Sequence, residues 1–242
     1  MGKQYWRGGN MLYPVPAVMV SCGRPEERPN IITVAWAGTV CSSPAMVSIS
    51  VRKERYSYDI LKETGEFVIN LITRDLTYAT DFCGVRSGRD VDKFAQMHLT
   101  PLPSQHISAP GIAESPVNLE CKVTQVIPLG SHDMFLAEVL GVTVDEKYMD
   151  ENGKFHLNDA GLVAYSHGEY FELGEKLGKF GYSVAKKQAA KTESVTKSAK
   201  PSGVGKKAAS AENRTASKTE AGNRRKSASK TGSADKQKSR RK

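Results

Sequence analysis

Hydroxyl residues and arginines gather in one short stretch of this sequence. Hydroxyl groups lie within Thr39–Ser43 at the end of a predicted strand, Arg52 and Arg55 follow the next strand, and Ser57 begins a predicted helix. Arginine can bind phosphate through two parallel hydrogen bonds, and a helix N-terminus offers free backbone amides. The stretch therefore predicts a site for an anion that carries a flat ring. The alternative is a solvent-exposed loop in which Glu54 balances the arginines.

Other common kinds of site are not indicated. The sequence has no GxGxxG opening a helix after a strand, no Walker A motif and no GxSxG elbow. The five histidines lack the spacing of metal ligands, and the four cysteines are scattered without a CxxC pair. We therefore expect no metal site, no disulfide framework and reduced thiols.

Many short strands must position the candidate residues. Met46–Val51 alternates apolar and small polar residues, as does Val117–Thr124, which is typical of half-buried strands. Further strands are predicted at Pro16–Cys22, Ile31–Val40, Phe67–Ile72, Phe135–Val144, Leu162–Tyr165 and Glu169–Leu173. Helices are predicted at Ser57–Leu61 (capped by Ser57 and stopped by Gly65), Asp75–Cys83 (ended by Gly84) and Asp90–Met97, with a long loop over Thr100–Pro116. A mainly β protein with short helices, closed into a barrel, fits this pattern.

Charge divides the chain into two regions. Residues 1–184 carry 17 Lys+Arg against 22 Asp+Glu, a balance of −5, and residues 185–242 carry 18 against 4, a balance of +14. The first region is long enough for one domain with a real core. The second, rich in Lys, Ala and Ser, lacks the large apolar residues that a core needs and is predicted to be a disordered tail. No signal peptide or membrane span is visible, so a cytoplasmic location is expected.

The tail leaves three roles open. Its basic pairs and triplets could contact nucleic acid or other polyanions in a salt-dependent way. They could also lie against an anionic membrane surface. The third alternative is a solubilising extension without a binding role.

The runs AWAGTVCSSP (Ala35–Pro44), RKERYS (Arg52–Ser57) and EFVIN (Glu66–Asn70) closely resemble the flavin reductase-like family, in its flavoredoxin-like branch. The resemblance covers roughly Asn10 to Lys187. One departure is Pro44–Ala45, where the family often has two prolines. The resemblance implies a split β-barrel that holds FMN noncovalently, in a homodimer with two FMN sites near the interface.

The resemblance also assigns candidate residues. Thr33, Ala35, Trp36, Thr39, Cys41 and Ser42 would contact the ring and the ribityl chain. Arg52, Arg55, Tyr56 and Ser57 would contact the phosphate. Asn70 matches a position that lines the pocket, and Lys93 and Phe94 are weaker candidates from the run GRDVDKF. No catalytic acid or base is expected, because the flavin itself carries out the chemistry.

Three residues have more than one interpretation. Trp36 could be a core residue instead of a flavin contact. Cys41 is interpreted as a small pocket residue, since it has no partner for redox chemistry at CxxC spacing. His167 could approach the flavin or a nicotinamide, or could lie in a surface turn.

The expected function is that of an FMN-dependent oxidoreductase. Electrons would pass from NADH, NADPH or a donor protein through FMN to flavin, an acceptor protein or a small molecule. The residues leave the choice of donor and acceptor open. The alternative is a non-catalytic module that binds or senses FMN and is localised by its polybasic tail.

Overall fold

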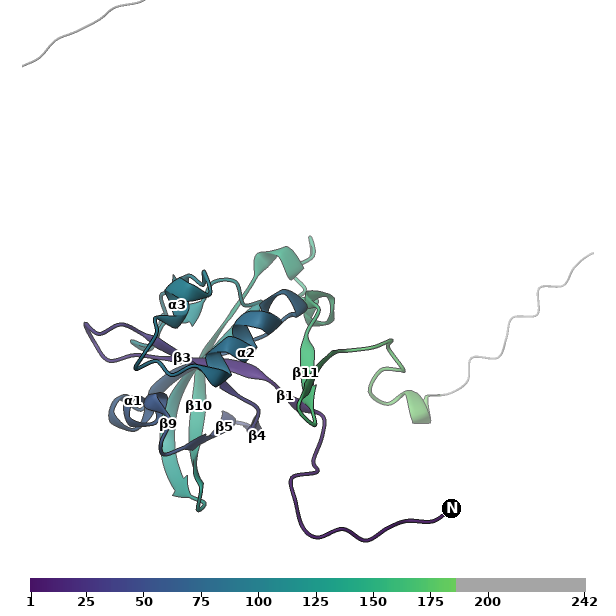
Figure 1. The fold of residues 1–242 in the computed structure, drawn as a ribbon. Helices are drawn as coiled ribbons and strands as arrows, with labels where there is room; N and C mark the ends of the chain where they lie inside the picture. Colours follow the sequence, from purple (N-terminus) through teal and green to yellow (C-terminus); the bar gives the residue numbers. More distant parts are fainter. Residues whose placement is uncertain (186–242) are drawn as a thin grey trace, which may run out of the picture. The chain divides into compact units, whose positions relative to one another are not determined.

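The structure, a computed structural model, describes residues 1–185 (Figure 1). The chain divides into two units, Met1–Ser183 and Val184–Lys242, and the first contains the β-sheets. The predicted disordered tail lies outside the described residues apart from its first position. Within the described part of the chain, no helix is long and apolar enough to cross a membrane.

A seven-stranded antiparallel sheet forms the main element of the described residues, in the order β3-β2-β6-β9-β10-β5-β4. Its strands are β2 (Val18–Cys22), β3 (Asn30–Val34), β4 (Ala37–Ser42), β5 (Ala45–Arg52), β6 (Glu66–Leu71), β9 (Val117–Pro128) and β10 (His132–Val144). The predicted mainly β fold is confirmed.

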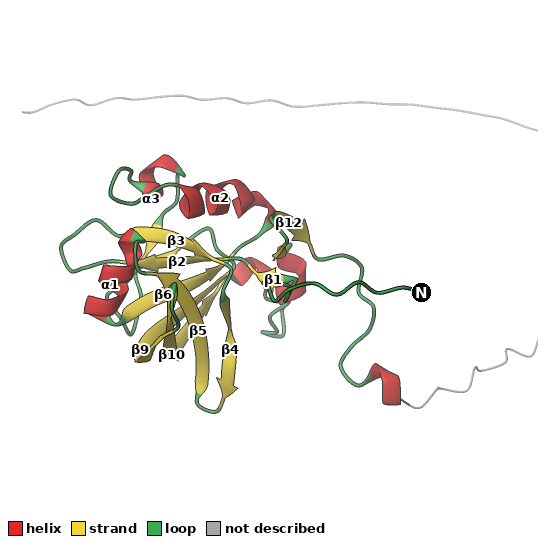
Figure 2. Ribbon diagram, turned by 60° about the horizontal axis from the view of Figure 1, so that its bottom comes forward, coloured by secondary structure: helices red, strands yellow, loops and turns green. Residues whose placement is uncertain are grey.

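The two edges of this sheet are neighbours in the sequence. Edge strands β3 and β4 are separated only by Ala35 and Trp36. A linker of two residues forces the sheet to curl until its edges approach each other (Figure 2). The backbone N–H of Ser50 on β5 then donates to the Trp36 carbonyl at 2.8 Å. The result is a barrel that stays split beside Trp36.

Helices cover the barrel, as Figure 2 shows for α2 and α3 beside β3. Among the described residues these are α1 (Tyr56–Thr64), α2 (Thr77–Val85) and α3 (Lys93–Gln96). On β2, Val18 and Val20 face the barrel core with α1, whereas Met19 faces a second core with α2 and α3. Strand β2 is buried along its whole length for this reason.

A second, three-stranded sheet holds the start of the domain, in the order β1-β11-β12. It consists of β1 (Val15–Pro16), β11 (Val163–Ser166) and β12 (Glu169–Glu172). A two-stranded pair, β7 (Pro101–Leu102) and β8 (Gly111–Ile112), lies within the predicted Thr100–Pro116 loop. Because Val15 pairs with Tyr165, the N-terminal segment is fixed beside β11.

Several predicted boundaries needed correction. The predicted strand Ile31–Val40 is two strands, β3 and β4. Gly65 ends α1 as predicted, with φ of 64° and its N–H donating to Leu61, but Ser57 does not cap the helix, which begins at Tyr56 without a side-chain cap. The predicted helix Asp90–Met97 is only the four residues of α3.

Gly84 does not end α2, which continues to Val85. A Cβ on Gly84 would lie 3.2 Å from Cβ of Thr33 on β3. The glycine therefore allows close approach of α2 to the sheet, which explains a small residue inside the helix.

The alternation along β9 is less clean than predicted, because Asn118 and Glu120 are also buried. Glu120 accepts backbone N–H bonds from Gln105 and His106, and its pKa is lowered by these hydrogen bonds despite the opposing desolvation. The Thr100–Pro116 loop thus covers the polar face of the strand.

Candidate functional site

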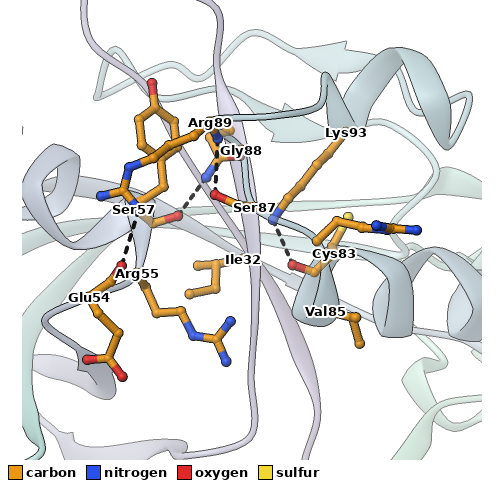
Figure 3. Close-up of a pocket in the computed structure, with 13 residues that line it drawn as sticks. Ile32, Glu54, Arg55, Ser57, Cys83, Val85, Ser87, Gly88, Arg89 and Lys93 are labelled. Carbon is orange, nitrogen blue, oxygen red and sulfur yellow. Dashed lines mark hydrogen bonds between the residues drawn. The ribbon is translucent and has the colours of Figure 1, made fainter.

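Three adjoining pockets form a groove beside the split of the barrel. The cationic pocket, about 190 Å³, is bounded by β3, the first turn of α1, the end of α2, the following loop and α3 (Figure 3). The middle pocket, about 140 Å³, lies between β3, Trp36 and β5. It shares Ile32 and Arg55 with the cationic pocket. The arm pocket, about 410 Å³, shares Trp36, Ser50 and His132 with the middle pocket. The three pockets thus follow one another along the split, from a charged end to an apolar end.

Four cations line the cationic pocket, Arg55, Arg86, Arg89 and Lys93, against one carboxylate, Glu54. The Arg89 guanidinium lies over the Tyr56 ring, 5.5 Å from its centroid, and donates to the Glu54 carbonyl at 3.3 Å. Arg55 donates to the Gly84 carbonyl at 3.3 Å from the other side of the pocket. This surplus of positive charge suits a phosphate dianion.

Lys93 forms the buried side of the cationic pocket. Its Nζ donates to the carbonyls of Ile31 at 2.6 Å and Cys83 at 2.7 Å. An ammonium group has three donors, so one remains for a ligand. Desolvation by burial, with a smaller contribution from nearby Arg55, lowers the Lys93 pKa to about 8. Its charge would become more favourable if an anion entered the pocket.

Gly88 lets the loop after α2 approach the floor of the cationic pocket. A Cβ at this position would come within 2.1 Å of Asn30 Oδ1 and 2.7 Å of a Tyr56 ring carbon. Asn30 in turn donates to Ser57 Oγ at 2.7 Å. Only glycine fits at this position without displacing Asn30 or Tyr56.

The middle pocket is lined by residues of β3 and β5, by Ala35 and Trp36 at the split, and by polar side chains of neighbouring segments. Arg52 lies here and not in the cationic pocket, and it pairs with Glu54 at 2.8 Å. Thr33 also lines the pocket, although its hydroxyl donates to the Thr80 carbonyl. The polar side chains of Ser50, Arg52, Arg55 and His132 line this pocket beside the residues of the split.

The structure brings eight of the predicted residues to the groove. Arg55, Tyr56, Ser57 and Lys93 line the cationic pocket, and Thr33, Ala35, Trp36 and Arg52 line the middle pocket. Trp36 was given two interpretations, and its half-buried position in both the middle and arm pockets favours the groove over the core.

Three predicted ring contacts, Thr39, Cys41 and Ser42, do not line any of the three pockets of the groove. They lie on β4, which leaves the split after Trp36 and ends in a turn where Ser42 pairs with Ala45. At about 3.3 Å per residue, Ser42 is roughly 20 Å along the strand from Trp36. These three residues are close to Trp36 in the sequence, but the structure places them outside the groove.

Asn70 and Phe94 also lie away from the groove. Asn70 is fully buried, donates to Met19 O and Ser21 Oγ, and accepts from the Ile112 backbone and the Asn118 side chain. Phe94 is buried in the second core under α2. Both residues hold neighbouring elements together.

Sequence reasoning missed Arg86, Ser87, Ser50 and His132, and it noted Gly88 and Arg89 only as the start of the run GRDVDKF. The signal for the loop was present: a serine and a glycine between two arginines form a short run suited to an anion. His132 had no such signal, because only the pairing of β10 with β5 sets it opposite Arg52, at the groove.

His167 lies in the β11–β12 turn with φ of 52°, and its ring meets Tyr13 edge-on with centroids 5.9 Å apart. It does not line the groove pockets. In the structure His167 packs against Tyr13, whose ring centroid also lies 6.3 Å from that of Trp36.

Comparison with known proteins finds a matching family model, related sequences and similar solved structures. The model of the flavin reductase like domain matches residues 10–174. A protein of Archaeoglobus fulgidus is 31% identical over 160 residues, which cover 66% of this chain and 88% of the relative. Flavoredoxin of Desulfovibrio vulgaris (Miyazaki F) is 33% identical with a TM-score of 0.70, over 76% of this chain and 100% of that one. Flavoredoxin from Methanosarcina acetivorans, at 24% identity and TM-score 0.67, covers the same shares and shows the common fold.

Proposed function

Because the chain belongs to the flavin reductase-like family, in its flavoredoxin-like branch, we propose that it holds FMN noncovalently in the groove and acts as a flavin-dependent oxidoreductase. The observation that carries the proposal is that the pockets of the groove adjoin one another. A pocket with four cations adjoins, at Ile32 and Arg55, a pocket that Trp36 and other residues at the barrel split line. FMN has the same order of parts: a phosphate, a chain and a flat ring.

The residues of the cationic pocket would bind the phosphate of FMN. Arg55, Arg86, Arg89 and Lys93 would neutralise the phosphate, and Gly88 keeps the space for it open. A phosphate held in this way would also distinguish FMN from riboflavin, which lacks the charged group. The bound flavin would supply two-electron chemistry, whereas the protein would orient it and limit its exposure to water.

The donor and the acceptor are part of the proposal. We expect NADH or NADPH, or an electron-transfer protein, to reduce the flavin, and free flavin, a protein or a small molecule to accept the electrons. The alternative, a non-catalytic FMN-binding or sensing module, shares the same groove and differs only in this step.

The decisive experiment is an absorption spectrum of the purified full-length protein, recorded before and after anaerobic addition of NADH or NADPH. Flavin bands that bleach would support the oxidoreductase and name its donor. Bands that persist with both nucleotides would favour a carrier that is reduced by a protein, or the sensing module. A colourless protein that cannot be reconstituted with FMN would overturn the proposal.

Two further properties are proposed and can be tested separately. A homodimer would have twice the 26.4 kDa chain mass by light scattering. Exposed apolar residues in the N-terminal segment, among them Tyr5 and Leu12, support association through that region. The cytoplasmic location and the contact of the basic tail with polyanions stay predictions from the sequence, and deletion of residues 188–242 tests the second by its effect on polyanion binding at low salt.

A further inference from the structure

Lys93 is a buried amine whose position suits covalent chemistry as well as the binding of charge. The residue is 3% exposed, and it lines the cationic pocket together with three arginines. Figure 3 shows its side chain extending from α3 toward the middle of the lining residues. Among the described residues its hydrogen-bond partners are the carbonyls of Ile31 and Cys83, and no carboxylate pairs with it. No negative charge therefore holds the proton on this amine.

The two carbonyls also determine which side of the amine is free to react. Nζ lies 2.6 Å from the Ile31 carbonyl oxygen and 2.7 Å from that of Cys83. A neutral amine has two N–H donors and one lone pair, so both donors are used by these carbonyls. The lone pair is left for the pocket, at the position where the charged form has its third N–H. A lone pair at this position can attack a carbonyl carbon.

The neutral form of Lys93 is well populated near neutral pH. Desolvation by burial is the largest cause of its pKa of about 8; Cys83 and Cys22 raise this pKa, and Arg55 lowers it. Roughly one side chain in ten is then neutral at pH 7, against fewer than about one in a thousand for a lysine with the ordinary pKa of 10.5. Lysines that are desolvated or lie beside a second cation are the ones that act as nucleophiles toward carbonyl compounds.

We propose that Lys93 is a covalent attachment site for small aldehydes that carry a phosphate group, in the flavin-free protein. The amine attacks the aldehyde carbon and a C–N bond forms. The carbonyl C–O bond then breaks, and its oxygen leaves as water with the two amine protons. The product is an imine, and nothing is oxidised or reduced. Attachment depends only on the cationic pocket, whereas its competition with FMN rests on the proposed function.

The pocket selects the aldehyde by charge and by size. Arg55 reaches the Gly84 carbonyl on one side of the pocket, and Arg89 lies over the Tyr56 ring on the other. Guanidinium groups suit the oxygens of a phosphate, which can accept two parallel hydrogen bonds. The volume of about 190 Å³ leaves little room beyond the phosphate and a short chain. Short-chain phosphorylated aldehydes therefore fit better than sugars or aromatic aldehydes.

The attachment should be reversible. A protonated imine has one N–H, so either the Ile31 or the Cys83 carbonyl loses the donor that it has in the free protein. A buried carbonyl without a donor is unfavourable, which promotes hydrolysis of the imine once the free aldehyde is removed. Such an aldehyde would thus block the phosphate site only while it is present.

The test exposes flavin-free full-length protein at pH 7 to glycolaldehyde phosphate or to glycolaldehyde, with cyanoborohydride to reduce the imine to a stable secondary amine. Peptide mass spectrometry measures the labelled fraction of Lys93, with the exposed Lys154 as the internal reference. We expect glycolaldehyde phosphate to label Lys93 at least about ten-fold faster than glycolaldehyde does, because the arginines hold its phosphate. Lys154 should show no such preference.

Two variants test the part played by the arginines. Arg89→Ala should slow labelling of Lys93 by glycolaldehyde phosphate and leave labelling by glycolaldehyde nearly unchanged. Arg74→Ala is the matched control, because Arg74 lies outside the cationic pocket and pairs with Glu172 at 2.8 Å. This control should label like the unmodified protein with both aldehydes. Circular dichroism verifies that both variants are folded.

Equal labelling of Lys93 by the two aldehydes, or label confined to exposed lysines, would overturn the inference. Without cyanoborohydride, dialysis should release the aldehyde, and an adduct that persists would contradict the reversible imine. Added FMN should protect Lys93 in proportion to the flavin bound. Labelling that FMN does not reduce would leave the attachment site standing and refute the place proposed for the FMN phosphate.

Discussion

The side-chain amide of Asn30 donates a hydrogen bond to the Ser57 hydroxyl at 2.7 Å. This contact joins β3 to the first turn of α1, and both residues are buried. Gly88 lies so close to Asn30 that no side chain fits between them. The floor of the cationic pocket is therefore built by three segments that are distant in the sequence.

Gly88→Ala should damage this floor. The added methyl group would lie 2.1 Å from Asn30 Oδ1, so Asn30 or the loop must move, and the phosphate site moves with it. We expect FMN affinity to fall by at least about ten-fold and riboflavin affinity to change little. Fluorescence titration of both ligands measures this. Gly174→Ala is the control, because a Cβ there has nothing within 4 Å. Equal losses for FMN and riboflavin would contradict the prediction.

Arg55→Ala should weaken FMN binding more than Arg52→Ala. Arg55 lines the cationic pocket, whereas Arg52 lines only the middle pocket and is paired with Glu54. Loss of a hydrogen bond to a charged group costs about 1.5–3 kcal/mol, or roughly a 10- to 150-fold increase in Kd. Isothermal titration of the two variants tests the difference. If Arg52→Ala has the larger effect, the phosphate lies elsewhere.

FMN affinity should fall as the pH rises above about 8. Burial lowers the Lys93 pKa to about 8 in the free protein, so its ammonium is charged at pH 7 and increasingly neutral above pH 8. The phosphate dianion favours the charged form, and its own ionisation, near pH 6, is complete in this range. The Kd for FMN should therefore rise with pH by up to ten-fold per unit until the pKa of the complex is reached.

Riboflavin is the matched ligand for this measurement, since it has the ring without the phosphate. Its Kd should stay nearly constant between pH 7 and 9. A parallel rise of both Kd values would place the titration at the ring and remove Lys93 from the phosphate site.

Asn70→Ala should destabilise the protein without changing how each folded molecule binds FMN. Asn70 joins β2, β6, β9 and the loop at Ile112 through buried hydrogen bonds, and removing it leaves buried partners unpaired. We expect about 2–4 kcal/mol lower free energy of unfolding in urea. Thr39→Ala, on exposed β4, should change stability little. An unaltered stability with weakened FMN binding would return Asn70 to the pocket.

The local pattern of the sequence was sufficient to predict the main strands and helices. The period-two alternation of Met46–Val51 correctly predicted β5 and its buried face. Gly65 correctly marked the end of α1. The cationic end of the site was also visible, because Arg55, Tyr56 and Ser57 are consecutive and stay together on one turn.

The sequence by itself determined a mainly β domain and a basic C-terminal region, and it predicted an anion site near Arg55. Only the tertiary structure decided which residues share the groove. Curling of the sheet joins Trp36 to Ser50 and His132, and it carries Thr39 and Ser42 away along β4. Likewise, the packing of α2 and α3 against β3 sets Lys93 against the Ile31 carbonyl and Gly88 beside Asn30. The physical reason is that strand pairing and helix packing depend on contacts between distant segments, which no local pattern specifies.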